Sequence, residues 1–413
     1  MLFGFIIRKL RYLSRSLSSK KDDTVICCDK EEIESSSKDD ANKSEKSKKL
    51  VKSLDENIKK MQAALAESTD TKVRYFRFGP KNSLSGALIF IDGMVNTVVV
   101  YDAILRTLKD WKTSQDDLTK KENLMDTIEQ EVLCAIDVKH ENAVDNLIKG
   151  CLNGDTVMLI NGCPCGLIID SKGWEKRSIT EPKSETVVRG PREGFTEDLR
   201  TNTTLIRRKI RNGSLKVEQM VVGRKTKTNI NIIYLDGIAN PKVIETVRKR
   251  IQKLDVESIL ETGYIEEYIE DAPFSPFATI SYSEKPDVTA AKILEGRVAI
   301  VVDGTPFVLT APMIFIESFQ TAEDYYVRSF YSSLTRIIRY IAYAITIFAP
   351  AIFIALTSFH HELIPTTLLF TIAQSREGTP FPVFVEALIL VIAFELLREA
   401  GIRLPKPVGQ AIS

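Results

Sequence analysis

The sequence has few of the residues and none of the patterns that usually carry catalysis. It contains three histidines in 413 residues, and the HExxH, GxSxG and P-loop patterns of metalloproteases, serine hydrolases and nucleotide-binding proteins do not occur in it. No charge sign dominates either, because 56 Lys and Arg residues nearly balance 55 Asp and Glu residues. We therefore predict a protein that is not an enzyme, with no cofactor, no metal and no nucleic-acid partner.

Cysteine is sparse and irregularly spaced, which excludes the disulfide framework of a small secreted domain. The six cysteines are Cys27, Cys28, Cys134, Cys151, Cys163 and Cys165. We interpret them as reduced thiols that face a cytoplasm-like compartment. Cys163 and Cys165 are too close together for a zinc knuckle, so a structural turn is the favoured interpretation.

The first 70 residues lack the apolar content of a folded domain. The leader, 1–20, has too short an apolar run for a secretory signal, and a frayed end is favoured over a weak contact with membrane lipid. Residues 21–70 are rich in Lys, Asp, Glu and Ser, which predicts a charged, disordered linker. Its last part, 50–65, is expected to form a solvated helix.

From residue 71 onward, apolar strands alternate with helical patterns. Residues 87–91 lead into a turn at Asp92-Gly93, and residues 230–235 lead into a similar turn at Asp236-Gly237, 144 residues later. A second set of residues matches at an offset of 142: Leu152, Gly154, Asn161, Gly162, Pro164 and Leu167 match Leu294, Gly296, Asp303, Gly304, Pro306 and Leu309. This predicts an internal duplication. The alternative is that these matches arise by chance, because turns of this kind are common in proteins.

The predicted fold class is α/β, or α+β in the broader sense, in a cytoplasmic domain of two lobes at 71–185 and 196–330. Each lobe is expected to hold a strand, two or more helices and then a hairpin. The hairpin turns are predicted at Asn161-Gly162 and Asp303-Gly304.

Residues 186–195 are predicted to form the hinge between the lobes. The candidate hinge or interface residues are Arg189, Gly190, Pro191, Arg192, Glu193, Gly194 and Phe195. Their glycines would also suit an anion cradle before a helix, but Pro191 removes one N–H donor, so the hinge is favoured. The basic stretch 205–211 that follows is interpreted as a solvated helix face rather than a contact with nucleic acid or anionic lipid.

Residues 331–413 are dominated by apolar runs, which predict an α-helical transmembrane region. Residues 340–358 carry no charge, and as a helix they would span about 29 Å, the thickness of the hydrocarbon layer. Residues 364–373 are too short to cross and predict a re-entrant or interfacial segment, whereas 381–397 predict a second crossing. The residues that flank the two crossings on one side are Arg328, Arg336, Arg339, Arg398, Arg403 and Lys406. Both lobes are therefore expected in the cytoplasm and residues 360–362 outside.

Two carboxylates fall in the second predicted crossing. Glu386 and Glu395 are nine residues apart and so project from opposite faces of a helix. An ionised carboxylate within a membrane is costly unless it meets water or a partner. Both are candidate gating residues, Glu386 the more so, and hydration near the headgroups is an equally good interpretation.

The order of several short segments resembles the A subunits of the GerA spore germinant receptors. In the lobes these segments are 181–182, 185–195, 201–202, 205–208, 274–277, 294–299, 303–306 and 323–326. In the membrane part they are 364–365, 375–377, 380–382, 386–387 and 394–401. The resemblance covers about residues 72–413.

The resemblance implies a multi-pass protein of the spore inner membrane that assembles with a transporter-like B subunit and a lipoprotein C subunit. It also implies a homo-oligomeric ring of A subunits, of the order of a pentamer, that conducts ions when a nutrient is sensed. Family members continue into further membrane helices, so residues 331–413 are expected to be only the start of an incomplete membrane domain.

The expected function is that of a receptor A subunit that couples nutrient sensing to ion release and the initiation of germination. An accessory membrane protein of dipicolinic acid release is the close alternative, because it shares this architecture. A membrane-bound phosphate-binding module or enzyme built on residues 189–195 is the alternative of another class. A neighbouring B-subunit gene favours the receptor.

Overall fold

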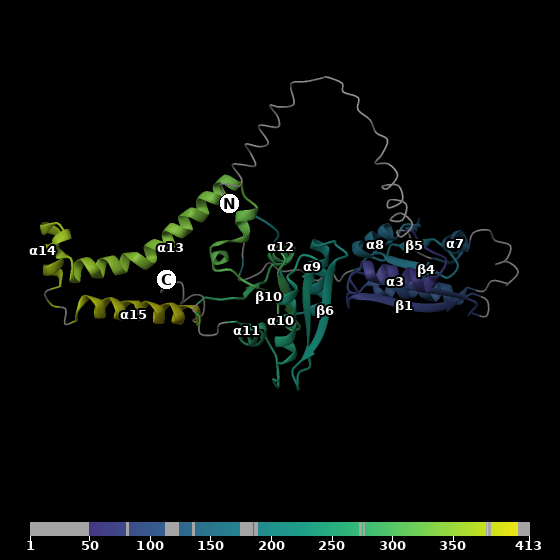
Figure 1. Ribbon diagram of the computed structural model, residues 1–413, viewed down its shortest axis with the longest axis horizontal. Helices are drawn as coiled ribbons and strands as arrows, with labels where there is room; N and C mark the ends of the chain where they lie inside the picture. Colours follow the sequence, from purple (N-terminus) through teal and green to yellow (C-terminus); the bar gives the residue numbers. More distant parts are fainter. Residues whose placement is uncertain are drawn as a thin grey trace, which may run out of the picture. The chain divides into compact units, whose positions relative to one another are not determined.

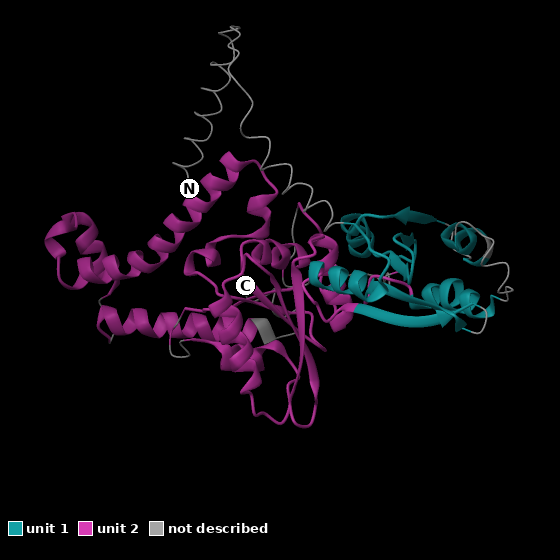
Figure 2. Ribbon diagram, turned by 45° about the vertical axis from the view of Figure 1, so that its right-hand side comes forward, with its two compact units in different colours: residues 1–64, 72–91, 97–172 teal, residues 65–71, 92–96, 173–413 magenta. Residues whose placement is uncertain are grey.

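The computed structural model describes residues 49–79, 82–111, 124–133, 137–173, 185, 189–271, 275, 277–376, 378 and 381–403. The chain divides into two compact units (Figure 2). The first comprises 1–64, 72–91 and 97–172, and the second comprises 65–71, 92–96 and 173–413. The predicted leader and the linker up to residue 48 lie outside the described residues.

The first unit is built on a five-stranded sheet with strand order β1-β2-β4-β5-β3. Strands β1, β4 and β5 of this sheet are labelled in Figure 1. Its strands are β1 (Thr71–Phe78), β2 (Leu84–Ile91), β3 (Val138–Glu141), β4 (Thr156–Ile160) and β5 (Gly166–Ile169). The central strand β4 is buried along its whole length, and it contacts the helices α3 (Leu54–Ala64) and α8 (Val144–Asn153). A strand covered in this way is mostly apolar rather than alternating, and the exception in β4 is Thr156.

Helix α3 corrects the prediction of a disordered linker up to residue 70. Leu54, Ile58 and Met61 are spaced at i, i+4 and i+7, and all three are buried. This spacing places them on one face of the helix, which packs in the first unit. The expected helix at 50–65 is therefore present, but it is a packed element rather than a solvated one. The remaining helical segments of this unit are α4 (Thr97–Val99), η2 (Val100–Arg106), α5 (Thr107–Asp110), α7 (Leu124–Thr127) and η3 (Ile128–Val132).

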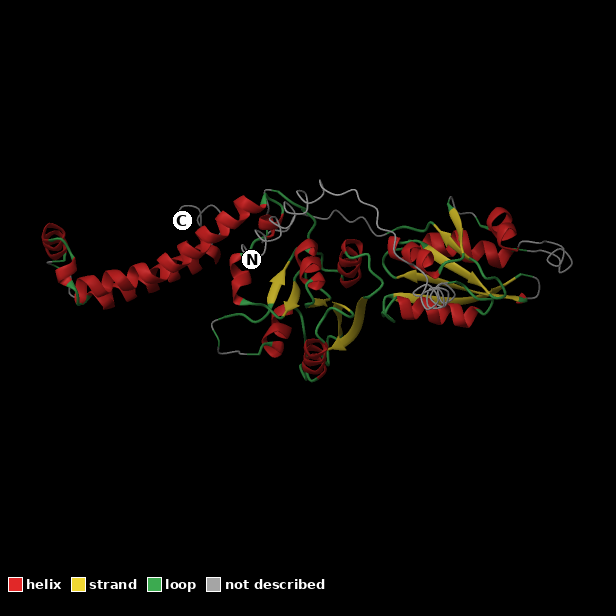
Figure 3. Ribbon diagram, turned by 45° about the horizontal axis from the view of Figure 1, so that its top comes forward, coloured by secondary structure: helices red, strands yellow, loops and turns green. Residues whose placement is uncertain are grey.

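The second unit has a sheet with strand order β6-β7-β9-β10-β8. Its strands are β6 (Leu215–Val222), β7 (Thr228–Leu235), β8 (Ser281–Ser283), β9 (Val298–Val302) and β10 (Val308–Ala311), and its helices are α9 (Leu199–Lys209), α10 (Pro241–Gln252), α11 (Thr262–Ile269) and α12 (Pro286–Leu294). On β7, Ile230 and Ile232 join a core with α10 and α11, whereas Ile233 joins a second core with α9 and α12. Helices therefore cover both faces of this sheet (Figure 3).

The two sheets have the same strand order when each unit is counted from its own first strand. Asp92-Gly93 follows β2 and Asp236-Gly237 follows β7, the second strand of each sheet. The described strand pairings are antiparallel. The class is therefore α+β, which is the second of the two terms predicted for the lobes, and the described pairings are not those of a parallel α/β sheet.

Three helices follow the second sheet: α13 (Ser329–Ser358), α14 (Thr366–Ser375) and α15 (Val383–Arg403). Among the described residues, α13 is the helix that is long and apolar enough to cross a membrane. It begins well before the span predicted at 340–358 and contains Pro350. With 10 residues, α14 is about 15 Å long and too short to cross. Whether α15 crosses stays a prediction.

Candidate functional site at the base of helix α13

Two short 3-10 helices connect the second sheet to α13. They are η4 (Phe315–Phe319) and η5 (Ala322–Tyr325). In η4, Glu317 accepts a hydrogen bond from Arg297, and its Oε2 lies 3.8 Å from Nζ of Lys292 on α12. The three side chains are 11%, 14% and 15% exposed. Glu317 therefore ties η4 to α12 and to the start of β9. Burial lowers the pKa of the Lys292 ammonium, an effect that the charge of Glu317 opposes.

Asp324 joins η5 to the first turns of α13. Its side chain is 4% exposed. Arg339 donates to both carboxylate oxygens, with Nη1 2.7 Å from Oδ2 and Nη2 3.0 Å from Oδ1, and Nε of Arg336 lies 3.2 Å from Oδ2. A bidentate arginine pair fixes orientation as well as position. We call Asp324, Arg336 and Arg339 the α13 clasp.

The hydrogen bonds of the clasp keep Asp324 ionised. Burial alone would raise the pKa of this carboxyl, but hydrogen bonds from Arg339, the backbone N–H of Thr321 and Arg336 outweigh burial, so the pKa lies below its ordinary value. Because the pKa is lower in the folded state, the pairing stabilises the protein at neutral pH. Its contribution is lost only in acid, as the pH falls through the lowered pKa.

Aromatic rings add an apolar contact beside the clasp. The ring of Phe319 lies edge-on to Tyr340 and Tyr343 of α13, with centroid separations of 5.1 Å and 4.9 Å. Arg336 lies over the ring of Tyr325, 4.9 Å from its centroid. Pairs of both kinds contribute beyond the area they bury. The base of α13 is therefore held against η4 and η5 by ion pairing and by ring packing together.

Sequence reasoning missed this site. In the sequence, Arg336 and Arg339 predict membrane orientation, and in the structure both are also paired with Asp324. The segment 323–326 stands out in the sequence only through the family resemblance. Asp324 precedes Arg336 by 12 residues and Arg339 by 15 residues. This spacing is not typical of a helix, strand or turn, so the sequence gives no signal for the pairing.

A cavity of about 680 Å³ lies between α12, β8 and the η4–η5 segment. We call it the α12 cavity. Lys285, one of its lining residues, is 1% exposed, and its Nζ has no hydrogen-bond partner among the described residues. Asp287 accepts a hydrogen bond from the hydroxyl of Tyr326 through Oδ2. The other oxygen of Asp287, Oδ1, is buried without a partner in the described part of the chain.

A third ionisable group of the cavity wall is Glu185, which accepts a hydrogen bond of 2.8 Å from Ser283. Burial raises the pKa of the Glu185 carboxyl, against the hydrogen bond from Ser283 and the positive charge of Lys285. Lys285 therefore influences Glu185 through its charge without a hydrogen bond between them.

The predicted hinge residues belong to the second unit. Arg189, Gly190 and Arg192 are exposed, Pro191 and Glu193 are partly buried, and Gly194 and Phe195 are buried. The N–H of Phe195 donates to the carbonyl of Glu284 at 2.8 Å, and Glu193 lies 2.9 Å from Lys209 on α9. Gly190 has a φ of +143°, and a Cβ there would come within 2.8 Å of the Tyr326 ring. The end of this segment is therefore fixed to the second unit, and residues 186–188 lie outside the described residues.

The basic stretch 205–211 is the predicted solvated face only in part, because Lys209 and Arg211 are exposed and Arg208 is partly exposed. Leu205, Ile206 and Arg207 are buried on α9. Arg207 is 1% exposed, and its Nε and Nη2 lie 2.8 Å and 2.9 Å from the two carboxylate oxygens of Asp70. Both residues belong to the second unit. Arg207 is therefore a core ion-pair partner rather than a surface contact for nucleic acid or lipid.

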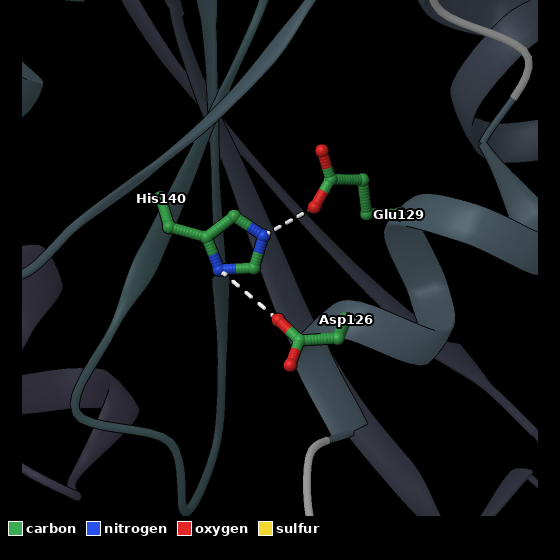
Figure 4. A group of neighbouring side chains, drawn as sticks. All are labelled: Asp126, Glu129 and His140. Atoms are coloured by element: carbon green, nitrogen blue, oxygen red, sulfur yellow. Dashed lines mark hydrogen bonds and ion pairs between the residues drawn. The ribbon is translucent and has the colours of Figure 1, made fainter.

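A histidine of the first unit lies between two carboxylates (Figure 4). Nε2 of His140 is 2.6 Å from Glu129, and Nδ1 is 3.8 Å from Asp126. An ion bound by both groups at about 2.0–2.2 Å would hold nitrogen and oxygen about 3.0–3.4 Å apart. The 2.6 Å separation is instead that of a direct hydrogen bond. We therefore assign the contact between His140 and Glu129 to hydrogen bonding between partly exposed side chains.

The described cysteines are free thiols: Cys151, Cys163 and Cys165. Burial raises the pKa of Cys151 to about 12, so this thiol stays protonated at neutral pH and is unreactive. Cys163 and Cys165 lie in the connection between β4 and β5, as expected of a structural turn. Cys27, Cys28 and Cys134 lie outside the described residues.

Both candidate gating carboxylates have basic neighbours. Glu386 lies on α15, 3.0 Å from Arg376 at the end of α14. Glu395 pairs with Arg398 one turn further along α15. The charge of Glu386 is therefore partly balanced within the chain.

Comparison with known proteins places this architecture in a family. Residues 59–413 match the family model described as Bacillus/Clostridium GerA spore germination protein. The chain is 41% identical to the uncharacterized membrane protein YfkQ of Bacillus subtilis, over 90% of this chain and 73% of that protein. It is 42% identical to spore germination protein KA of Bacillus subtilis, over 87% of this chain and 65% of that protein.

A solved structure is similar as well. It is the N-terminal domain of the A subunit of the Bacillus megaterium spore germinant receptor GerK3, which is 34% identical with a TM-score of 0.51 and matches 65% of this chain and 97% of that domain. The family match covers most of the chain and agrees with the resemblance of the hinge and membrane segments. The chain belongs to the GerA family of spore germination proteins.

Proposed function

We propose that this chain is the A subunit of a spore germinant receptor and couples nutrient sensing to ion release and the initiation of germination. The names of its relatives support a role in germination. The α13 clasp is the observation that carries the coupling, because Asp324 connects a folded unit directly to the membrane-type helix.

In this mechanism the clasp passes a change in the second unit to α13. A receptor of this kind needs two conformational states. Nutrient binding must change the free-energy difference between them by about 1 to 3 kcal/mol. A rigid, paired attachment at the base of α13 transmits such a difference, whereas a flexible linker would absorb it. We place the hinge between the two units at residues 189–195. The end of this segment at Phe195 stays fixed to the second unit when that unit moves.

The proposed setting is the spore inner membrane, with a multi-pass helical region and both units in the cytoplasm. The proposed partners are the receptor B and C subunits, further copies of this chain in a ring, and membrane lipid. We also propose that the two units arose by internal duplication. Their identical strand order and the equivalent positions of the turns at Asp92-Gly93 and Asp236-Gly237 support this.

The function is tested in spores that lack their own germinant receptors. Expression of the complete reading frame that contains this chain, together with its B and C partners, is expected to restore nutrient-triggered cation release. Omission of this chain alone should abolish that release. If cation release proceeds without the chain and only dipicolinic acid release fails, the accessory role is right and the receptor role is wrong.

Replacement of Glu386 by Gln tests the proposed role in permeation. The change keeps the shape of the side chain and removes its charge, so a wet pore would lose part of its attraction for cations. Nutrient-triggered cation release should slow several-fold while assembly with the B and C subunits persists. Glu395→Gln is the matched control on α15, with little expected effect. If cation release by an assembled Glu386→Gln receptor is unchanged, Glu386 has no role in permeation. Its remaining role would then be the structural ion pair with Arg376.

A further inference from the structure

We propose that the first unit binds a Zn²⁺ ion at the edge of its sheet, through Nδ1 of His140, the carboxylate of Asp126 and the thiolate of Cys165. His140 lies on the edge strand β3, Asp126 lies on α7, and Cys165 immediately precedes β5. All three residues belong to the first unit. The ion joins the helical segment 124–132 to the edge of the sheet, and this role does not depend on the receptor function.

Strand pairing brings the histidine and the cysteine together. In the register of β3 and β5, His140 lies opposite Leu167. Because side chains alternate along a strand, Cys165, two residues before Leu167, faces the same side of the sheet as His140. Sγ of Cys165 is accordingly 3.9 Å from Nδ1 of His140. The two residues are 25 positions apart, so the spacing of Cys163 and Cys165 alone favoured a structural turn.

Glu129 orients the imidazole ring without being a ligand. Figure 4 shows the ring between two carboxylates, with one nitrogen directed toward each. Oε2 of Glu129 is 2.6 Å from Nε2 of His140, the length of a hydrogen bond in which Nε2–H donates. That bond leaves the lone pair of the neutral ring on Nδ1. Metal-bound histidines usually donate their other N–H in this way, which fixes the tautomer and makes the ligating nitrogen more basic.

The distances around Nδ1 suit an ion better than a second hydrogen bond. Oδ1 of Asp126 lies 3.8 Å from Nδ1, which is too long for a hydrogen bond. A tetrahedral Zn²⁺ at its usual ligand distances holds a nitrogen about 3.3 Å from a carboxylate oxygen and about 3.6 Å from a sulfur. Each of the two observed separations therefore needs to shorten by only about 0.3 to 0.5 Å. Cys165 also lies 3.7 Å from the carbonyl oxygen of Gly166, a weak contact that the ion replaces.

The set of ligand atoms selects the ion. An imidazole nitrogen, a thiolate and a carboxylate suit Zn²⁺, whereas Mg²⁺ and Ca²⁺ prefer oxygen ligands. The thiol of Cys165 releases its proton to the solvent when the ion binds, and its sulfur donates an electron pair to the metal. The side chains of His140 and Asp126 are 31% and 49% exposed. The ion can therefore enter from solvent, and water completes its coordination.

Cobalt(II) tests the ligand set directly, because it replaces zinc and absorbs light through a bound thiolate. The whole chain in detergent, stripped of metal and kept reduced, should show a thiolate-to-cobalt charge-transfer band with an equimolar amount of Co²⁺. Zn²⁺ should remove this band, and an excess of Mg²⁺ should not. Cys165→Ser should abolish the band, whereas Cys163→Ser, the matched control in the same turn, should keep it. No band in the unmodified chain, or a band that survives Cys165→Ser, would overturn the proposal.

Two further variants separate the ligand from the residue that positions it. Glu129→Gln should keep the cobalt band and weaken Zn²⁺ binding by about tenfold to a hundredfold, and His140→Gln should weaken it further. Without metal, both should melt within about 2 °C of the unmodified chain, because the changes are at partly exposed positions. Saturating Zn²⁺ should raise the melting temperature of the unmodified chain by about 3 °C or more. An equal rise in His140→Gln would contradict the site. These measurements need no spores, so their failure is distinct from failure of the receptor function.

Discussion

Replacement of Asp70 by Asn is expected to lower the free energy of unfolding of the second unit by about 3 to 5 kcal/mol. Asp70 is the partner of Arg207, and the two side chains are 9% and 1% exposed. Nη2 of Arg207 also donates to Ser68 at 3.0 Å. Asn keeps the shape of Asp70 but leaves the guanidinium charge of Arg207 buried without compensation, which is the costly outcome.

Chemical denaturation of the purified chain, followed by a probe in the second unit, measures this effect. Asp92→Asn is the matched control, because Asp92 pairs with Arg200 at 3.2 Å while Arg200 is 64% exposed. The control should cost less than about 1 kcal/mol. The double variant Asp70→Leu with Arg207→Met should recover most of the lost stability, since an apolar pair can replace a buried ion pair. If the Asp70→Asn chain is as stable as the Asp92→Asn control, the buried charge of Arg207 does not need Asp70 to compensate it.

Replacement of Asp324 by Asn is expected to loosen the contact between η5 and α13 within the second unit. The loss should be about 2 to 3 kcal/mol, below the range for a fully buried pair because Arg336 and Arg339 are 21% and 30% exposed. That loss corresponds to about a 30- to 150-fold change in an equilibrium constant. In the assembled receptor, nutrient-triggered cation release should therefore fall by at least about tenfold.

The control for this variant is Glu362→Gln, which neutralises an exposed carboxylate just beyond the other end of α13. It should leave cation release unchanged. The amount of Asp324→Asn protein in the membrane and its assembly with the B and C subunits are measured in parallel. Normal cation release by an assembled Asp324→Asn receptor would mean that the signal reaches the membrane by another route.

Local patterns predicted most of the elements. The strand at 230–235 corresponds to β7, and its Asp236-Gly237 turn follows directly. The uncharged run 340–358 identified α13, although the helix starts at Ser329. These features depend on residues that are close in sequence, so periodicity and turn chemistry are sufficient to find them.

Pairings between distant residues could not be predicted. Asp70 and Arg207 are 137 residues apart, and in the sequence Arg207 is one of several basic residues on a polar helix. Helix α3 has a charged composition that suggested disorder, yet three apolar residues at helical spacing were enough to bury one face. The orientation of strands within a sheet also depends on tertiary packing, so the sequence pattern alone did not decide between α/β and α+β.

The most direct test of the proposed coupling is a double-mutant cycle on the α13 clasp. Cation release is measured in spores that carry the receptor with Asp324→Asn, with Arg339→Gln, and with both changes. If the ion pair transmits the signal, the double variant should be no worse than the more impaired single variant, with a coupling energy of about 1 kcal/mol or more. Fully additive losses from the two changes would contradict the claim that Asp324 and Arg339 act on α13 as a pair.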